Sequence, residues 1–333
     1  MEMEMETETT TIITSTAPTE AKVSPAAKKT LLILNTLLLS IGVCGGPLII
    51  RLYFIDGGNR IWLSSFLQAC GWPVIVVVLI ILYFHRRTTN NQRATLVYMR
   101  PRLFFLVAVI GVLTGVDNYL YVYGVSGLPV STSQLIMASQ LGFTAFFAYI
   151  LVKQKFTAYS INAVVLLSFD CWFGALLYAF LLPLTELTYN KAKQDITYTL
   201  VLEFQTVMSL FAAMFSTAGM IINNDFKVIP REAAEFELGK TEYYVILCLS
   251  AIFWQCFFLG VIGVIFCASS LLSGIIISVF LPVTEVLAVV FYKEKFQVEK
   301  GVALVLSLWG FASYFYGEYK FMKKIKTNKQ STV

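Results

Sequence analysis

Apolar residues along the chain come in runs of about twenty that are separated by short polar segments. An α-helix rises 1.5 Å per residue, so about twenty residues are enough to cross the hydrocarbon core of a bilayer. Transmembrane β-strands would instead give alternating segments of about ten residues, which the sequence lacks. The pattern predicts an all-α, polytopic membrane helix bundle with about nine spans, at residues 31–50, 61–84, 103–124, 128–152, 161–182, 199–222, 244–265, 268–292 and 301–319.

Composition supports this class and limits the partners. The 333 residues are 57% hydrophobic and 14% charged, whereas soluble domains carry about 25% charged residues. The net charge of +5 does not indicate a nucleic-acid partner, because Lys and Arg flank the apolar runs. Residues 1–30 are polar and Thr-rich, which predicts a disordered cytoplasmic tail. Residues 31–319 are expected to form the transmembrane transporter domain, and residues 320–333 a basic cytoplasmic tail.

The distribution of charge conflicts with a count of nine spans. The loop 85–102 carries five arginines and no acid, and the tail from Lys320 is also basic, so both are expected on the cytoplasmic side together with the amino terminus. Seven predicted spans separate them, and an odd number puts them on opposite sides. The segment 161–183, INAVVLLSFDCWFGALLYAFLLP, explains the conflict in one of two ways. It is a re-entrant hairpin covered by other helices, or the start of one span joined to the end of the next.

Two stretches 140 residues apart resemble each other and end on KxKF, at Phe156 and Phe296. A basic and aromatic end to a span also arises by chance. As a true repeat, the similarity predicts a 5+5 inverted-repeat transporter with halves of about 31–169 and 170–319.

Polar residues inside the spans are the candidates for function, since they are costly in lipid unless they face a cavity or a partner. The sequence has one histidine and no P-loop, HExxH or GxSxG motif, so we expect neither an enzyme nor a metal or cofactor site. Thr114, Asp117, Asn118 and Tyr121 share one helix face at i, i+3, i+4 and i+7. They either line a substrate cavity or mark the interfacial end of a helix.

The other candidates are amides, carboxylates and one tryptophan. Gln140, Gln205, Trp254 and Gln255 join Asn118 and Tyr121 as expected substrate-binding residues. Glu285 is the first candidate for proton coupling, followed by Asp117 and Glu203, although Glu203 can also extend to the interface. The motif VCGGPLI at residues 43–49 predicts either a broken first span that exposes backbone to a substrate or a proline kink.

Several ordered motifs between residues 30 and 319 resemble the plant purine permease family of the drug/metabolite transporter superfamily. They are CGGPLIIRLYF, GGNRIW, DNYLYVYG, LPVSTSQLIMASQ, YTLVLEFQ, WQCFFLG, LPVTEVLAVVFYKEKF and SLWGFASYFYGE. The resemblance implies ten helices in an inverted repeat and the uptake of adenine, cytokinins and related purine derivatives with protons, with alkaloid or pyridoxine uptake in some members. One departure stands out: FDCWFG joins the fifth and sixth spans directly, so that about thirty residues of the family pattern are missing.

These observations predict proton-coupled uptake of a purine-like small molecule across the plasma membrane. Aromatic faces can stack on the planar ring, and side-chain amides can meet its edge bidentately. A transporter of nucleotide sugars or phosphorylated metabolites would need Lys or Arg deep in the membrane, and none is found. A non-transporting isoform created by the fused 161–183 segment is the remaining alternative.

Overall fold

The computed structural model describes residues 25–89, 97–127, 140–152, 173–192 and 197–293, together with the single positions Val305, Trp309 and Tyr316. Every regular element among these residues is helical. The predicted spans at 128–152 and 161–182 therefore lie partly outside the described residues, and the predicted span at 301–319 lies outside except for those single positions. The helices are α1 (Pro25–Ile55), α2 (Ile61–Ala69), α3 (Trp72–Thr89), α4 (Pro101–Gly127), α6 (Gln140–Phe147), the π-helix η1 (Ala148–Val152), α8 (Phe173–Lys191), α9 (Tyr198–Ile222), α10 (Asp225–Glu235), α11 (Lys240–Cys267) and α12 (Ser270–Tyr292).

The described residues form a polytopic helical bundle, as the hydrophobic pattern predicts. Within the described residues, six segments are long and apolar enough to cross a membrane: Ala26–Ile55, Ile61–Thr88, Pro101–Ser126, Tyr198–Ile222, Lys240–Cys267 and Ser270–Tyr292. Each corresponds to a predicted span. α1 begins at Pro25, six residues before the predicted start of the first span at residue 31.

The first span is not broken at its Gly-Gly-Pro motif, because α1 is a single helix with Pro47 inside it. Proline has no N–H, which leaves the carbonyl four residues earlier, that of Val43, without its helical donor. The hydroxyl of Thr284 on α12 lies 3.3 Å from this carbonyl oxygen and 3.0 Å from the carbonyl oxygen of Phe280 on its own helix, so the two oxygens share one hydrogen. A neighbouring helix thus supplies a shared donor to the freed carbonyl, which helps the span to tolerate the proline.

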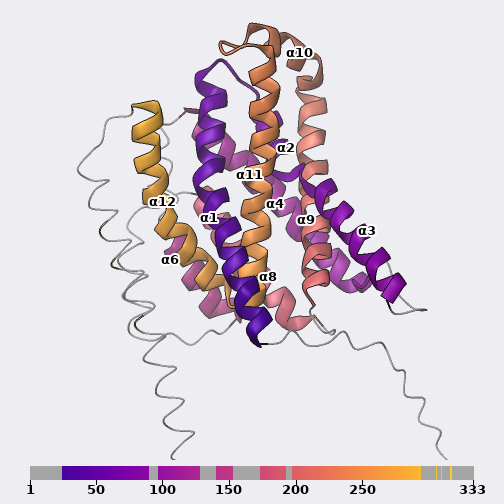
Figure 1. The fold of residues 1–333 in the computed structure, drawn as a ribbon. Coiled ribbons are helices and arrows are strands. Elements are labelled where there is room, and N and C mark those ends of the chain that lie inside the picture. The colour runs from indigo at the N-terminus through magenta and orange to yellow at the C-terminus, as the bar shows by residue number, and fades with distance from the viewer. Residues whose placement is uncertain are drawn as a thin grey trace, which may run out of the picture.

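The glycines of the same motif region allow α1 and α11 to approach closely, and the two helices lie side by side along the bundle (Figure 1). A Cβ atom on Gly42 would lie 2.4 Å from the backbone nitrogen of Phe257. One on Gly46 would lie 3.0 Å from the ring of Trp254. Small residues of this kind let helix backbones meet in a membrane bundle, and here they place α11 aromatic side chains against α1.

The second span is the broken one. α2 ends at Ala69 and α3 starts at Trp72, so Cys70 and Gly71 interrupt the apolar segment. Pro73 adds to the interruption, because its missing N–H cannot bond to the carbonyl of Ala69. The predicted discontinuity therefore exists, but in the second span instead of the first.

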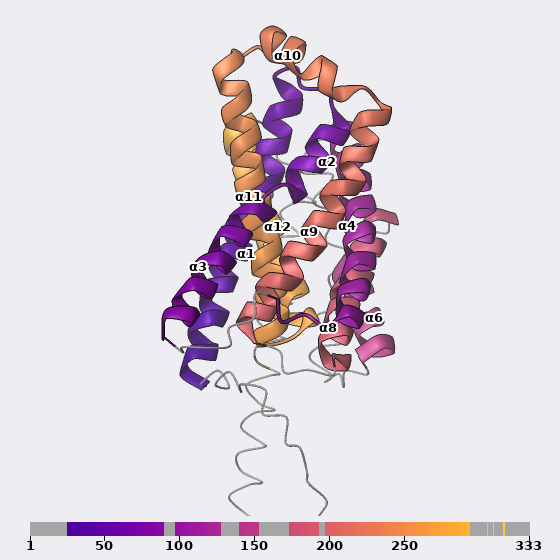
Figure 2. The ribbon, with the colours of Figure 1, turned by 90° about the vertical axis from the view of Figure 1, so that its right-hand side faces the viewer.

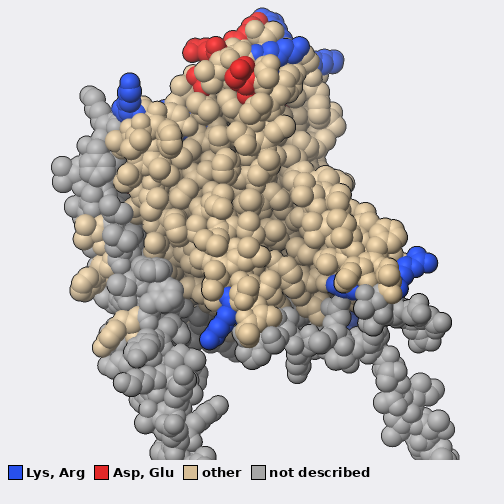
Figure 3. All heavy atoms as spheres, in the orientation of Figure 1, with Lys and Arg blue, Asp and Glu red and all other residues tan. Residues whose placement is uncertain are grey.

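Charged residues gather at the two ends of the bundle. On the face drawn in Figure 3, Lys, Arg, Asp and Glu cluster over α10 at one end, further Lys and Arg lie near the opposite end, and uncharged residues cover the middle. Figures 1 and 2 show α10 at the end where α1 and α9 finish, while α3 finishes at the opposite end of the bundle, which is also the end at which α4 starts. The acid-rich 223–243 segment and the arginines around residues 86–102 therefore lie at opposite ends.

A buried polar cluster holds the α10 end together. The carboxylate of Glu232 on α10 accepts hydrogen bonds from the hydroxyls of Tyr53 on α1 and Tyr243 on α11, the latter at 3.1 Å. Arg60, just before α2, pairs with Glu232 at 3.2 Å and with Asp225 at 3.7 Å. One carboxylate therefore joins three separate parts of the bundle, and we call these five residues the α10 polar cluster.

Candidate functional site

A cavity lies in the middle of the bundle, between α1, α2, α4, α8, α11 and α12. Together with the open solvent space at its mouth, it spans about 490 Å³. Most of its wall is apolar, and a few polar groups converge on it, which is the usual character of a small-molecule site. The lining residues are Gly42, Val43, Pro47, Gln68, Asp117, Asn118, Tyr121, Tyr178, Trp254, Phe257, Phe258, Ile277 and Leu281.

Four of the residues singled out from the sequence meet in this cavity. Asp117, Asn118 and Tyr121 come from α4, and Trp254 comes from α11. Asp117 and Asn118 are only 6% and 2% exposed, so their polar groups are inside the bundle and not at its interfacial end. Three of the four residues of the α4 stripe therefore line a cavity inside the bundle. That this cavity binds a substrate stays a prediction.

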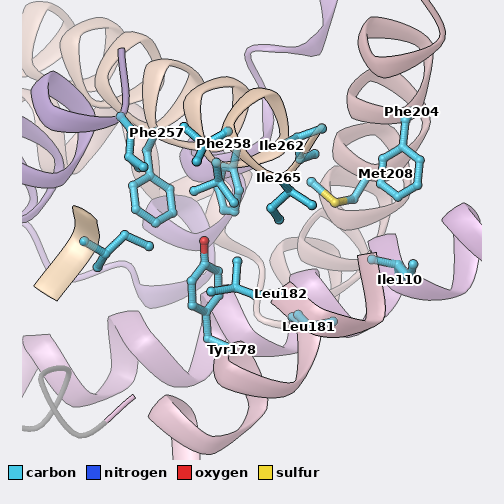
Figure 4. Close-up of a cluster of buried hydrophobic side chains, with 14 of the residues drawn as sticks. Ile110, Tyr178, Leu181, Leu182, Phe204, Met208, Phe257, Phe258, Ile262 and Ile265 are labelled. Atoms are coloured by element: carbon cyan, nitrogen blue, oxygen red, sulfur yellow. The ribbon is translucent and has the colours of Figure 1, made fainter. Parts of the chain in front are cut away.

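Two polar lining residues were missed by the sequence analysis, Gln68 and Tyr178. Gln68 is buried at the end of α2, where an amide stands just before the Gly71–Pro73 interruption; that combination of polar residue and helix breaker was a usable signal. Tyr178 belongs to α8, inside the segment that was interpreted as a fused span. Figure 4 shows its hydroxyl pointing from α8 toward Phe257 and Phe258 on α11.

The cavity contains several hydrogen-bond donors that no described residue satisfies. These buried atoms are Gln68 Nε2, Asn118 Nδ2, Tyr178 OH and Trp254 Nε1. A buried polar atom without a partner costs about 1–3 kcal/mol. Such atoms gathered around one space are therefore suited to a ligand that supplies acceptors.

Aromatic rings form the sides of the cavity. The rings of Tyr121 and Trp254 have centroids 5.3 Å apart at 72°, and Trp254 meets Phe257 at 5.3 Å and 75°. Tyr178 lies more nearly parallel to Phe257, at 5.9 Å and 34°. Since rings stand at steep angles to their neighbours, a flat ligand that stacks on one ring meets the edge of the next.

The remaining candidates occupy other places. Glu203 accepts hydrogen bonds from the backbone N–H groups of Tyr98, at 2.9 and 3.1 Å, and Met99, at 2.9 Å, just before α4 begins. Gln205 Nε2 donates to Ser209 on its own helix at 2.9 Å. Neither residue is among the lining residues of the cavity.

Gln255 and Glu285 are buried near the cavity but are not among its lining residues. Gln255 packs at the α2–α3 interruption, where a Cβ on Gly71 would lie 2.5 Å from its Oε1. Glu285 follows Thr284 on α12. Gln140 is the first residue of α6, and its side chain lies outside the described part of the structure.

A second, smaller cavity adjoins the first and shares Tyr178 and Phe258 with it. It also includes Thr114, Thr185 and Ile262, which lie one or two turns farther along α4, α8 and α11 toward the end opposite α10. Tyr178 and Phe258 therefore stand between two consecutive spaces along the bundle.

Known proteins resemble most of the chain. The family model described as purine nucleobase transmembrane transport matches residues 30–173 and 170–324. Purine permease 3 of Arabidopsis thaliana is 52% identical, with 88% of this chain and 92% of the relative covered. Purine permease 2 is 48% identical, with 90% and 95% covered, and purine permease 21 is 33% identical, with 81% and 75% covered, both from the same plant.

The alignments also show a difference in length. The alignment with purine permease 3 has 321 positions, whereas 88% of this 333-residue chain is about 293 residues, so about 28 positions of the relative have no counterpart here. The alignment with purine permease 21 has 296 positions, whereas 81% of this chain is about 270 residues, so about 26 positions of that relative have no counterpart here. The two family matches, meanwhile, meet at residues 170–173, within the 161–183 segment. With matches that together run from residue 30 to residue 324, the chain belongs to the purine nucleobase transmembrane transport family.

Proposed function

We propose that this protein binds purine nucleobases and derivatives such as adenine or cytokinins and carries them across the plasma membrane by proton-coupled uptake. One observation carries the proposal: a chain of this family has a mid-bundle cavity with aromatic sides, an amide and a carboxylate. Membership in the family supports the purine, and the cavity supports a flat ligand with a polar edge. Alkaloid or pyridoxine uptake by the same cavity would use the same aromatic sides.

Recognition follows from the shape and the hydrogen-bonding groups of a purine. The ring has two apolar faces, which Tyr121 and Trp254 can contact by stacking and edge-to-face packing. Its edge carries donors and acceptors, which Asn118 can meet with both amide atoms, as asparagine and glutamine do with adenine in other complexes. Asp117, next to Asn118, can accept from the exocyclic amino group or from a ring N–H.

Asp117 is our candidate for proton coupling. Ionisable residues inside membrane spans commonly mark proton pathways, and Asp117 is the carboxylate among the residues that line the cavity. Its charge and the presence of the substrate can therefore affect each other directly. Glu285 stays a second candidate, since it is buried on α12 close to this region.

Ten crossings in two inverted halves are the architecture that we propose for the complete family pattern. The positions of the described helix ends support it, because the acid-rich 223–243 segment lies at the opposite end of the bundle from the described parts of the arginine-rich loop, residues 85–89 and 97–102. The positive-inside rule then assigns the α10 end to the outer side and the amino terminus to the cytoplasm.

A short form that binds purines without transporting them is the second candidate. The unmatched positions of the relatives and the meeting of the two family matches at residues 170–173 favour it. Together they support the loss of about 28 residues between the fifth and sixth spans. Alternating access in such transporters needs two halves that move against each other, and a shortened connection between them limits that motion.

Uptake of radiolabelled adenine into yeast that lacks its own purine uptake system tests both candidates. Tyr121→Ala should lower uptake at least about 10-fold, because a buried ring is removed from the cavity. Tyr123→Ala is the matched control, since Tyr123 lies two residues later on α4 and is 62% exposed. A chain with the missing positions of purine permease 3 restored is run in parallel. Uptake only by the restored chain supports the short, non-transporting form, and equal loss in both tyrosine variants contradicts the assigned site.

A further inference from the structure

The interrupted second span brings an amide to the cavity. α2 ends at Ala69, and the chain turns at Cys70 and Gly71 before α3 begins. Discontinuous membrane helices occur at the substrate sites of many transporters, where the interruption lines a cavity. Here the last turn of α2 carries Gln68 into the wall of the cavity that the polar pair Asp117 and Asn118 on α4 also lines.

Gln68 is almost completely buried, with 1% of its side chain exposed. Its Nε2 has no hydrogen-bond partner within the described part of the chain. Ser65, one turn earlier on the same helix, is equally buried but exchanges a hydrogen bond with Ser216 at 3.0 Å. A buried amide donor is costly to leave unsatisfied, so the contrast between the two residues points to an external acceptor for Gln68.

The donors and acceptors that line the cavity indicate which kind of ligand carries that acceptor. Asn118, Tyr178 and Trp254 each present a further buried donor atom without a described partner, as Gln68 does. Asp117 supplies the carboxylate among the lining residues. A protonated organic cation would bring more donors to a wall that already has an excess of them. A neutral heteroaromatic ring with several unprotonated, pyridine-type nitrogens matches the wall.

We infer that Gln68 is a specificity-determining residue, which donates from Nε2 to one unprotonated ring nitrogen of the bound heterocycle. The inference rests on the proposed function. It adds that Gln68, at the interrupted second span, recognises an unprotonated ring nitrogen of the ligand. The ligand is selected for the acceptor nitrogens on its edge, and aromatic stacking alone does not select it.

Replacement of single ring nitrogens by carbon tests this inference directly. Binding of radiolabelled adenine to the purified full-length protein is measured by competition with unlabelled adenine and with 1-, 3- and 7-deazaadenine. Each analogue keeps the ring shape but lacks one acceptor nitrogen. Equilibrium binding is used so that the result does not depend on transport. The variants are Gln68→Met and Gln68→Leu, which both remove the donor without introducing another, and Ser65→Ala is the control.

In the wild type and in Ser65→Ala, at least one deaza analogue should bind about 10- to 100-fold more weakly than adenine, since a buried donor then lacks its acceptor. In both Gln68 variants the ratio for one particular analogue should fall to within about 2-fold, with the other two ratios unchanged. The agreement of the two variants guards against a folding defect in one of them. Adenine binding with all three ratios unchanged overturns the role of Gln68 alone. Failure of the wild type to bind adenine overturns the proposed function and this inference with it.

Discussion

The α10 polar cluster predicts a large and specific effect of one carboxylate on stability. Glu232→Ala removes the acceptor of two buried tyrosine hydroxyls and one partner of Arg60. Hydrogen bonds to charged groups contribute about 1.5–3 kcal/mol each. Arg60 is 29% exposed, so its ion pair adds about 1 kcal/mol or less. The free energy of unfolding should therefore fall by about 3–5 kcal/mol, which is the range for breaking a buried charged network.

The same helix offers a matched control. Glu235 also pairs with an arginine, Arg231, at 3.0 Å, but these side chains are 67% and 78% exposed. Exposed pairs of this kind contribute about 0.3–0.5 kcal/mol, so Glu235→Ala should be nearly silent. Thermal unfolding of the purified protein in one detergent measures both variants, and Glu232→Ala should melt at least about 5 °C lower than Glu235→Ala. Equal melting temperatures would refute the idea that this cluster holds the α10 end together.

Two further predictions concern packing and pH. Gly42→Ala should lower the melting temperature strongly, because its new Cβ meets the backbone of Phe257. Gly124 has no atom within 4 Å of the position of a new Cβ. In the same assay, Gly124→Ala should therefore leave the free energy of unfolding unchanged or raise it by up to about 1 kcal/mol. Burial and the nearby Glu237 raise the pKa of Asp56, a residue outside the spans, so its ionised form is disfavoured in the folded state. Asp56→Asn should therefore stabilise the protein at pH 8 and lose this advantage as the pH falls through the raised pKa, because protonated Asp56 no longer carries the cost. A gain in stability that is equal at pH 8 and at a pH below the ordinary Asp pKa of about 3.9 contradicts this.

Helical periodicity made much of the site predictable from the sequence. Asp117, Asn118 and Tyr121 share a face because residues three and four apart lie together on a helix, and their expense in lipid indicated that the face is covered. Helical periodicity does not predict which other helix packs against these three residues. Trp254 could be selected as a deep aromatic residue, but its contact with Tyr121 is set by the close approach of α1 and α11 at Gly42 and Gly46.

The misplaced helix break shows what a local motif leaves undetermined. A proline removes one backbone donor wherever it stands, and the consequence depends on whether another group bonds to the freed carbonyl. For Pro47 that group is the hydroxyl of Thr284, which is 237 residues away in the sequence. The hydrogen-bond partners of Glu203 are likewise distant in the sequence. Its carboxylate accepts from backbone N–H groups before α4, 104 and 105 residues away, and no local pattern reveals them.

We expect ligand binding and transport to depend on different parts of this chain. The two family matches meet at residues 170–173, next to the described start of α8 (Phe173–Lys191). The binding groups Gln68, Asn118 and Trp254 come from other helices. Adenine binding should therefore be nearly the same in this chain and in the chain with restored length, while uptake differs, because only the restored positions add to the connection between the halves.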